Sequence, residues 1–395
     1  MREAVIVAGA RTAVGKSHKG LARQYRSDEM AAHVIRHLLS LHNDRLDPAQ
    51  VEDVVLGCAY PEGPQGNNMG RVVALRSGLP SSVAGMTLNR LCASGLQAIA
   101  IAAQRVLTGE SDIIIAGGAE TMSLVKRGGF QWDPNPTVQQ EYPGVYMNMG
   151  LTAEILAAER GITRDEMDEF AYHSHRKAAL ALDKGYFDEE IVPLEIDETI
   201  EEADGSSRVV HHHFRHDEHL RRETTLEALA RLKPAFKDDG LVTAGNSSPL
   251  SDGAAAVIIM EAATAARLGF QPLARFVGFS AGGVRPEIMG IGPVVAVPRA
   301  LDRAGLQMAD IDLIELNEAF AAQAVPVMRD LDMNPDIVNV NGGAIALGHP
   351  LGCTGAKLTL HLLNEMRRRR SRYGLVTMCI GGGMGAAGIF ENLTN

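Results

Sequence analysis

The feature that most constrains the fold of this chain is a faint internal repeat with a nearly constant spacing. Three pairs of segments, 260, 261 and 265 positions apart, are alike: residues 46–59 with 306–319, Cys92 with Cys353, and Ala116 with Gly381. In the first pair (LDPAQVEDVVLGCA and LQMADIDLIELNEA), a turn leads into an apolar strand in both copies. Segments that recur at one offset predict two homologous halves, with chance similarity of apolar strands as the alternative.

Short apolar segments alternate with longer amphipathic segments in both halves. The segments expected as strands are 4–8, 53–56, 113–116 and 313–316, and those expected as helices include 27–41 and 93–107. This alternation is typical of an α/β protein whose sheets are covered by helices. Aromatic residues make up only 5% of the chain and glycines number 41. We therefore expect an interior of small and aliphatic side chains in close contact.

The region between the halves has a different composition, with Trp132, several prolines and four of the seven tyrosines. Thr163 and Glu166 form a capping-box pattern that predicts the start of a helix. We expect an N-terminal core half (residues 1–119), an inserted loop domain (120–249) and a C-terminal core half (271–395). Residues 250–270, with a strand at 254–260, are expected to return to the N-terminal half.

Charge and cysteine content exclude several classes of function. The 38 basic and 48 acidic side chains give a net charge of −10, which is the wrong sign for binding nucleic acid. We expect neither a membrane-spanning helix nor a membrane partner. The four cysteines are widely spaced and form no CxxC pair, which argues against a disulfide framework or a zinc site. Reduced thiols in a cytoplasmic protein are therefore expected.

A histidine-rich run between residues 211 and 219 could suggest a metal site. The run has no regular ligand spacing and no accompanying carboxylate or cysteine ligands. It is interpreted as a solvated loop, and no metal is expected.

Cys92 is the first candidate for chemistry, because it precedes small residues at the start of a strongly apolar helix. The positive end of the helix dipole and its unpaired N–H groups favour the thiolate, the nucleophilic form of cysteine. A free cysteine is more often a small core residue, and this segment alone leaves both interpretations open. Cys58 and Cys353 lack a comparable setting and are expected to be structural.

Three residues in the C-terminal half could assist such a nucleophile. His349 is constrained between a glycine and a proline and could act as its base, with a packing or capping role as the alternative. Cys379 ends an apolar strand, and the glycines after it would let a substrate approach main-chain N–H groups; structural burial is the competing interpretation. Asn317 follows the expected strand 313–316, where it could belong to an active site or cap a helix.

Together these segments resemble the thiolase family over essentially the whole chain. The likeness is carried, in family order, by residues 10–16 (ARTAVGK), 89–95 (NRLCASG), 116–123 (AGGAETMS), 243–248 (TAGNSS), 317–320 (NEAF), 341–355 (NGGAIALGHPLGCTG) and 379–383 (CIGGG). The resemblance implies the five-layered αβαβα thiolase fold, with two duplicated core halves and an inserted loop domain that binds coenzyme A.

The resemblance also implies roles for individual residues. Cys92 would accept the acyl group, His349 would activate it, and Cys379 would be the acid/base that handles the α-proton of acetyl-CoA. The oxyanion-binding groups implied are a water held by Asn317 and the main-chain N–H groups of Cys92 and Gly381. The contacts implied for substrate or coenzyme A are Ser248, Arg221 and Met149. Coenzyme A and acetyl-CoA would be substrates, with no bound cofactor.

One departure from the family pattern bears on the direction of the reaction. Biosynthetic members typically carry His before the Met-Gly of the pocket segment, and this chain has Asn148 there. The resemblance therefore favours degradative thiolysis of 3-ketoacyl-CoA, as in fatty acid β-oxidation. The alternatives are an acetoacetyl-CoA acetyltransferase and, ranked lower, a non-catalytic lipid-binding protein of this fold. A homodimer or homotetramer and a hydratase/dehydrogenase partner are further expectations from the family.

Overall fold

The computed structural model describes residues 2–202 and 206–394. In this part of the chain, ten strands form one mixed sheet in the order β10-β11-β12-β9-β1-β8-β5-β3-β4, with the short β2 (Gly15–Lys16) beside β8. The other strands are β1 (Ala4–Arg11), β3 (Asp53–Gly57), β4 (Ala84–Leu88), β5 (Ile113–Thr121), β8 (Ser251–Glu261), β9 (Ala274–Gly283), β10 (Leu313–Leu316), β11 (Tyr373–Ile380) and β12 (Met384–Asn392). All five expected strands, including the one at 254–260, are present.

The sheet consists of two halves with the same strand order. The run β3-β5-β8-β1 corresponds to β10-β11-β12-β9, and in each run a parallel pair is followed by two antiparallel pairings. The two halves meet along β1 and β9, where Val5 pairs with Arg275 and Ile6 with Ala274. The predicted duplication is confirmed, and this short pairing joins the two sheets into one.

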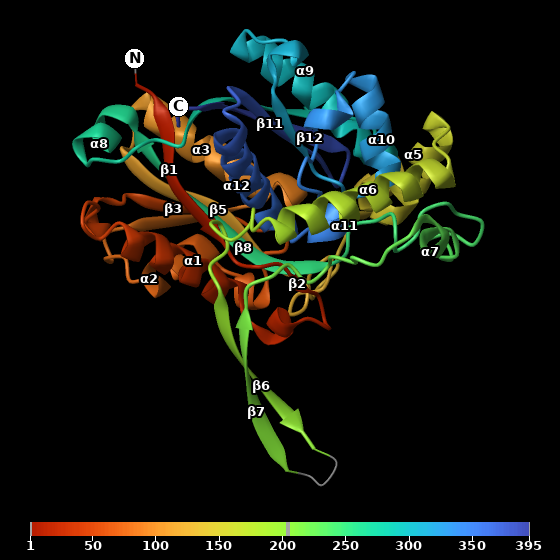
Figure 1. Ribbon diagram of the computed structural model, residues 1–395, viewed down its shortest axis with the longest axis horizontal. Helices are drawn as coiled ribbons and strands as arrows, with labels where there is room; N and C mark the ends of the chain where they lie inside the picture. Colours follow the sequence, from red (N-terminus) through yellow and green to blue (C-terminus); the bar gives the residue numbers. More distant parts are fainter. Residues whose placement is uncertain (1, 203–205, 395) are drawn as a thin grey trace.

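Helices cover both outer faces of the folded sheet and fill the space between its halves (Figure 1). The outer helices are α1 (Ser27–Leu41) and α2 (Met69–Arg76) on the N-terminal half, and α9 (Gly292–Ala304) and α10 (Ala321–Asp330) on the C-terminal half. Between the halves lie α3 (Ser94–Thr108) and α12 (Leu351–Arg369), whose buried side chains share one core with strands of both halves. This arrangement gives the expected five layers.

Glycines allow the two central helices to approach each other closely where they begin. A Cβ atom on Gly95 would lie 2.7 Å from the main-chain oxygen of Gly352, and one on Gly355 would lie 2.2 Å from the nitrogen of Leu96. Neither contact leaves room for a side chain. The chain segments that lead into α3 and α12 therefore lie at the same end of the core.

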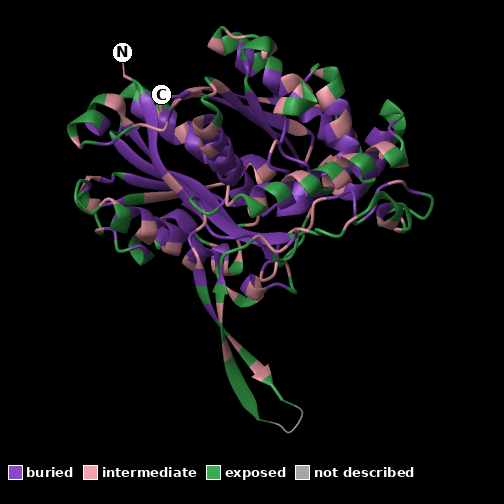
Figure 2. Cartoon of the chain, viewed as in Figure 1, coloured by how far each residue is buried: buried purple, intermediate pink, exposed green. Residues whose placement is uncertain are grey.

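The composition of the first central helix bears on the expectation that the chain has no membrane-spanning helix. Among the described residues, Leu91–Thr108 is long and apolar enough by length and composition to span a membrane, although no such segment was expected. Most of this helix is buried in the protein, as the purple ribbon of α3 in Figure 2 shows. Packing between two sheets accounts for its apolar composition.

The region between the halves contains peripheral helices and one long hairpin. Its helices are α4 (Pro136–Glu141), α5 (Met149–Arg160), α6 (Arg164–Asp183) and α7 (Leu226–Ala230), and the capping box predicted at Thr163 and Glu166 is present at the start of α6. Strand β8 then pairs with β1 and β5 of the N-terminal half. Two further helices, α8 (Ala262–Arg267) and α11 (Ala344–Leu347), follow later in the chain.

Residues 211–214 of the histidine-rich run lie in a strand, so the prediction of a loop is wrong for this part of the run. β6 (Leu194–Glu201) and β7 (Ser207–Phe214) form a hairpin that projects from the body of the molecule (Figure 1). His212 on β7 lies opposite β6, with its Nε2 3.0 Å from a carboxylate oxygen of Glu198. Most side chains of the hairpin are exposed (Figure 2). Three consecutive histidines in β7 give no alternation of apolar and polar residue types, which is the pattern that identifies a strand in a sequence.

Candidate active site

Cys92 lies in a short 3-10 turn, Leu91–Ala93, immediately before α3. The turn is held by local hydrogen bonds, because the Leu91 N–H donates to Asn89 Oδ1 (2.7 Å) and the Ser94 hydroxyl donates to the Leu91 carbonyl (2.7 Å). Leu91 adopts a left-handed conformation with φ of 46°, which costs a residue other than glycine about 1–2 kcal/mol. The local sequence thus presents Cys92 at a helix start, as predicted.

Two opposing influences set the pKa of the Cys92 thiol. Burial is the largest influence and raises the pKa of the Cys92 thiol to about 11. Hydrogen bonds from the main-chain N–H groups of Gly381 and of Cys92 itself lower the pKa but do not compensate. The N–H groups at the helix start therefore favour the thiolate, as expected, but burial has the larger effect. At neutral pH the thiol is protonated and needs a base.

Cys379 and Gly381 bring the end of β11 to this sulfur. Burial, followed by the charge of Cys92, raises the pKa of Cys379, so the two cysteines are near enough to interact electrostatically. Cys379 is 0% exposed, whereas Cys92 is only partly buried. A substrate can therefore reach Cys92, and Cys379 is a neutral S–H group that can give up a proton beside it.

Asn317 and His349 form a second pair of predicted residues that the structure brings into contact. Asn317 follows β10, and its side-chain Nδ2 lies 3.4 Å from Nε2 of His349. The other ring nitrogen, Nδ1, lies 2.6 Å from the hydroxyl oxygen of Thr354. Burial and, to a smaller extent, the charge of Lys357 lower the pKa of His349 to about 3. The imidazole is therefore neutral at physiological pH and can accept a proton.

Two buried carboxylates connect the strands to the segments that carry these residues. Glu318 accepts hydrogen bonds from the Ser174 hydroxyl (2.7 Å) and the Ile345 N–H (3.1 Å), which fixes the chain ahead of His349. Glu120 accepts from the Gly352 N–H at 2.9 Å, at the start of α12. Burial raises the pKa of both carboxyl groups. Both residues lie in segments that carry the family resemblance, but neither was predicted to have this supporting role.

Met149 lies beside the thiols. It is the first residue of α5, and the side chain of Asn148 caps this helix by accepting from the Gly150 N–H at 2.9 Å. The Met149 sulfur lies 3.4 Å from the point that a Cβ atom on Gly381 would occupy. A larger residue at position 381 would therefore press on Met149 and on the side chain of Leu91, whose Cδ1 lies 3.2 Å from the same point.

The two remaining predicted residues lie in different surroundings. Ser248 is partly buried, and its hydroxyl and main-chain N–H both donate to the Ala319 carbonyl at 3.0 Å, which ties it to the segment that begins with Asn317. The side chain of Arg221 is exposed. Within the described residues, Arg221 makes no hydrogen bond or ion pair with any other predicted site residue.

Three buried polar residues behind His349 were missed by reasoning from the sequence: Ser251, His219 and Lys357. A polar residue within an otherwise apolar strand or helix was the signal available, since Ser251 begins β8 and Lys357 lies between Ala356 and Leu358 in α12. Their contacts are described below.

Comparison with known proteins agrees with this arrangement. The family descriptions "Thiolase, N-terminal domain" and "Thiolase, C-terminal domain" match residues 4–263 and 270–392. The chain belongs to the thiolase family. Among curated thiolases, a 3-ketoacyl-CoA thiolase of Bacillus subtilis is 52% identical over 99% of this chain and 100% of its own length, and one of Saccharophagus degradans is 46% identical over 99% of both.

A solved thiolase-fold structure is also similar. The acetyl-CoA acetyltransferase of Bacillus anthracis superposes with a TM-score of 0.87 at 40% identity, covering 100% of this chain and 99% of the other. The thiolase fold expected from the sequence is therefore confirmed.

Proposed function

We propose that this protein is an acyltransferase that cleaves 3-ketoacyl-CoA by thiolysis, giving acetyl-CoA and an acyl-CoA shortened by two carbons. The observation that carries the proposal is the convergence of Cys379 and two main-chain N–H groups on the sulfur of Cys92. The neutral imidazole of His349 lies at the start of the adjoining central helix. The curated relatives named 3-ketoacyl-CoA thiolase support the same activity.

The first half of the reaction begins with proton removal from Cys92. His349 takes the thiol proton at Nε2, and the sulfur forms a bond to the 3-keto carbon of the substrate. The bond between C2 and C3 then breaks, and its electron pair passes to C2 as the enolate of acetyl-CoA. Cys379 donates its S–H proton to C2. Acetyl-CoA leaves, and the shortened acyl group remains on Cys92 as a thioester.

The second half returns the enzyme to its starting state. Cys379, now a thiolate, takes the proton of free coenzyme A, whose sulfur attacks the acyl-Cys92 thioester. The shortened acyl-CoA leaves, and Cys92 regains its proton from His349. A mechanism with an acyl-enzyme between two substrates is ping-pong, and the same steps run in reverse are a Claisen condensation.

Hydrogen-bond donors stabilise the negative oxygen in each half. The N–H groups of Cys92 and Gly381 face the sulfur that becomes acylated, so they are suited to the oxyanion formed there, with a contribution of about 3–4 kcal/mol for each donor. A water held by Asn317 would serve the thioester oxygen of acetyl-CoA. Ser248, Met149 and, on the exposed side, Arg221 would contact the coenzyme A moiety.

The direction we propose is degradative, as in β-oxidation, because Asn148 replaces the histidine typical of biosynthetic members and instead caps α5. The second candidate is an acetoacetyl-CoA acetyltransferase, which the similarity to the Bacillus anthracis enzyme favours. Thiolysis rates measured with 3-ketoacyl-CoA substrates of four to sixteen carbons would separate the two. We expect kcat/KM to remain high beyond four carbons; activity confined to acetoacetyl-CoA would contradict the degradative assignment.

We also propose a cytoplasmic homodimer or homotetramer that uses coenzyme A only as a substrate. The edge strand β4 supports self-association, since all five of its residues are exposed or only partly buried. The four free thiols of the described chain are consistent with a reducing compartment. A hydratase/dehydrogenase partner would fit the chemistry, because oxidation of a 3-hydroxyacyl-CoA yields the 3-keto substrate. Light scattering after size-exclusion chromatography would test the assembly.

A further inference from the structure

The main chain that leads to His349 is bent and hydrogen-bonded on one side by a buried ammonium group. Gly348 has φ of 86°, a conformation that favours glycine. Lys357, on α12, donates from Nζ to the carbonyls of Leu347 (3.2 Å) and Gly348 (2.8 Å). Lys357 is only 1% exposed, so these bonds are shielded from competing water.

A serine holds the same segment from the other side. The main-chain N–H of His349 donates to Ser251 Oγ at 3.0 Å, and the Ser251 hydroxyl donates to the Pro249 carbonyl at 2.8 Å. His219 Nε2 lies 3.0 Å from Ser251 Oγ and 3.2 Å from the Gly15 carbonyl. A neutral His219 with its proton on Nε2 donates to both oxygens, and every one of these groups is then satisfied.

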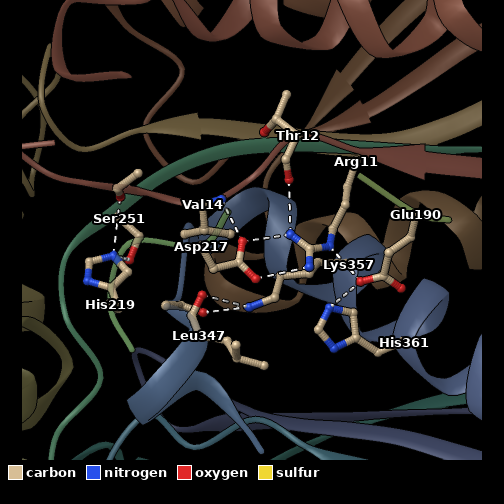
Figure 3. A network of polar contacts seen from close by, with 12 residues as sticks. Arg11, Thr12, Val14, Glu190, Asp217, His219, Ser251, Leu347, Lys357 and His361 are labelled. Carbon is tan, nitrogen blue, oxygen red and sulfur yellow. Dashed lines mark hydrogen bonds and ion pairs between the residues drawn. The ribbon is translucent and has the colours of Figure 1, made fainter. Parts of the chain in front are cut away.

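Lys357 is not explained by packing alone. An ammonium group in the interior is costly, and an apolar residue of similar volume would fill the core at least as well. No ion pair joins Lys357 to a carboxylate among the described residues, although the charges of Asp217 and Glu190 reach it at longer range. The carboxylates of Asp217 and Glu190 instead accept hydrogen bonds from Arg11, as Figure 3 shows. The direct partners of Lys357 are the two carbonyls ahead of His349.

One helix therefore controls both the ring and the main chain of the histidine. Thr354, near the start of α12, lies against Nδ1 of the ring, and Lys357, three residues later, binds the preceding carbonyls. Residues three apart in a helix lie on the same face. The orientation of the imidazole is thus tied to the helix that crosses α3, which follows Cys92.

We propose that Lys357, together with Ser251, is a positioning residue that holds His349 in the orientation needed to take the proton of Cys92. This proposal rests on the proposed function, in which His349 is the base. Lys357 touches no reacting atom. Its effect is exerted through the geometry of Gly348 and His349, where an error of about 1 Å can reduce the rate by about a hundredfold.

The test compares Lys357→Met, Lys357→Gln and a control, Thr359→Val, in thiolysis of a 3-ketoacyl-CoA. Thr359 is buried on the same helix and donates to the Gly355 carbonyl at 2.8 Å, so its replacement removes a buried hydrogen bond that does not reach His349. We expect kcat to fall about a hundredfold in Lys357→Met with KM for coenzyme A within about threefold. Lys357→Gln keeps an N–H donor and should recover at least about a tenth of the wild-type kcat.

The outcomes separate failure of this inference from failure of the proposed function. Wild-type turnover by His349→Asn would refute the proposed role of the base itself. If His349→Asn is inactive but Lys357→Met is as active as Thr359→Val, the positioning role is wrong. If circular dichroism shows that Lys357→Met does not fold, Ser251→Ala decides instead: a kcat lowered about tenfold at unchanged KM supports the proposal, and a wild-type kcat overturns it.

Discussion

The main-chain N–H of Gly381 donates a hydrogen bond to the sulfur of Cys92, across the two halves of the duplicated chain. The bond lowers the pKa of the thiol, but burial outweighs it and the pKa rises to about 11. Cys92 is therefore activated only when a base removes its proton. This relationship underlies the first three predictions.

Replacing Cys92 by serine should reduce acyl transfer by at least about a thousandfold, because a neutral hydroxyl is a much poorer nucleophile beside one histidine. Steady-state thiolysis and the yield of acyl-enzyme by mass spectrometry would measure the loss. Cys353→Ala is the matched control, since Cys353 is the buried counterpart of Cys92 in the second half. It should stay within about threefold of the wild-type rate; near-normal turnover by Cys92→Ser would refute the assigned nucleophile.

Replacing Cys379 by alanine should separate the two half-reactions. Acyl exchange between acetyl-CoA and labelled coenzyme A needs only Cys92 and its base, so it should fall no more than about tenfold. Cleavage of acetoacetyl-CoA also needs a proton delivered to C2 and should fall by about a hundredfold or more. Equal losses in both assays would contradict the division of labour between the two thiols.

Alkylation of Cys92 by iodoacetamide should follow its raised pKa. In His349→Asn, which lacks the base, the thiolate fraction is set by the pKa of about 11, so the rate should rise about tenfold per pH unit between pH 7 and 10. Peptide mapping would follow modification of residue 92 alone. A rate that levels off below pH 9 would show that the thiol ionises more easily than its burial predicts.

The free energy of unfolding should decrease as the pH falls below about 6.5. Burial lowers the pKa of His349 to about 3 and that of His219 to about 4, from an ordinary value of 6.5. The unfolded chain therefore binds more protons between these values, and each histidine reduces stability by up to about 1.4 kcal/mol per pH unit. Urea unfolding at pH 4.5 to 7.5 would measure the slope. His219→Gln should show a shallower slope than the wild type; an identical slope would contradict the assignment.

Much of the fold could be predicted because local patterns reflect burial in the final structure. The strand Leu313–Leu316 and the helix Ser27–Leu41 have the predicted limits, since each buries an apolar face. The hairpin β6–β7 could not be predicted, because it buries little of its surface and its histidines are stabilised by pairing with β6. Such a segment becomes a strand because it pairs with a neighbouring strand, and the local sequence does not show which segment that neighbour is.

The site was predictable in its residue types but not in its energetics. Cys92, His349, Cys379 and Asn317 stand in recognisable motifs at strand ends and helix starts. The protonation of Cys92 depends on how deeply the folded core buries its thiol. A local sequence motif does not predict that depth. The bond from Lys357 to Gly348 likewise depends on a main-chain bend nine residues earlier.

The two halves are alike in fold, but the segments that lead into their central helices contribute different groups to the candidate active site. The nucleophile comes from one copy, whereas the base, the second thiol and the asparagine come from the other. An ancestor with a single copy could have assembled a complete centre only by association of two chains. In the fused chain each copy needs to supply only part of the centre, and Cys353, at the position in the second copy that corresponds to Cys92, is buried.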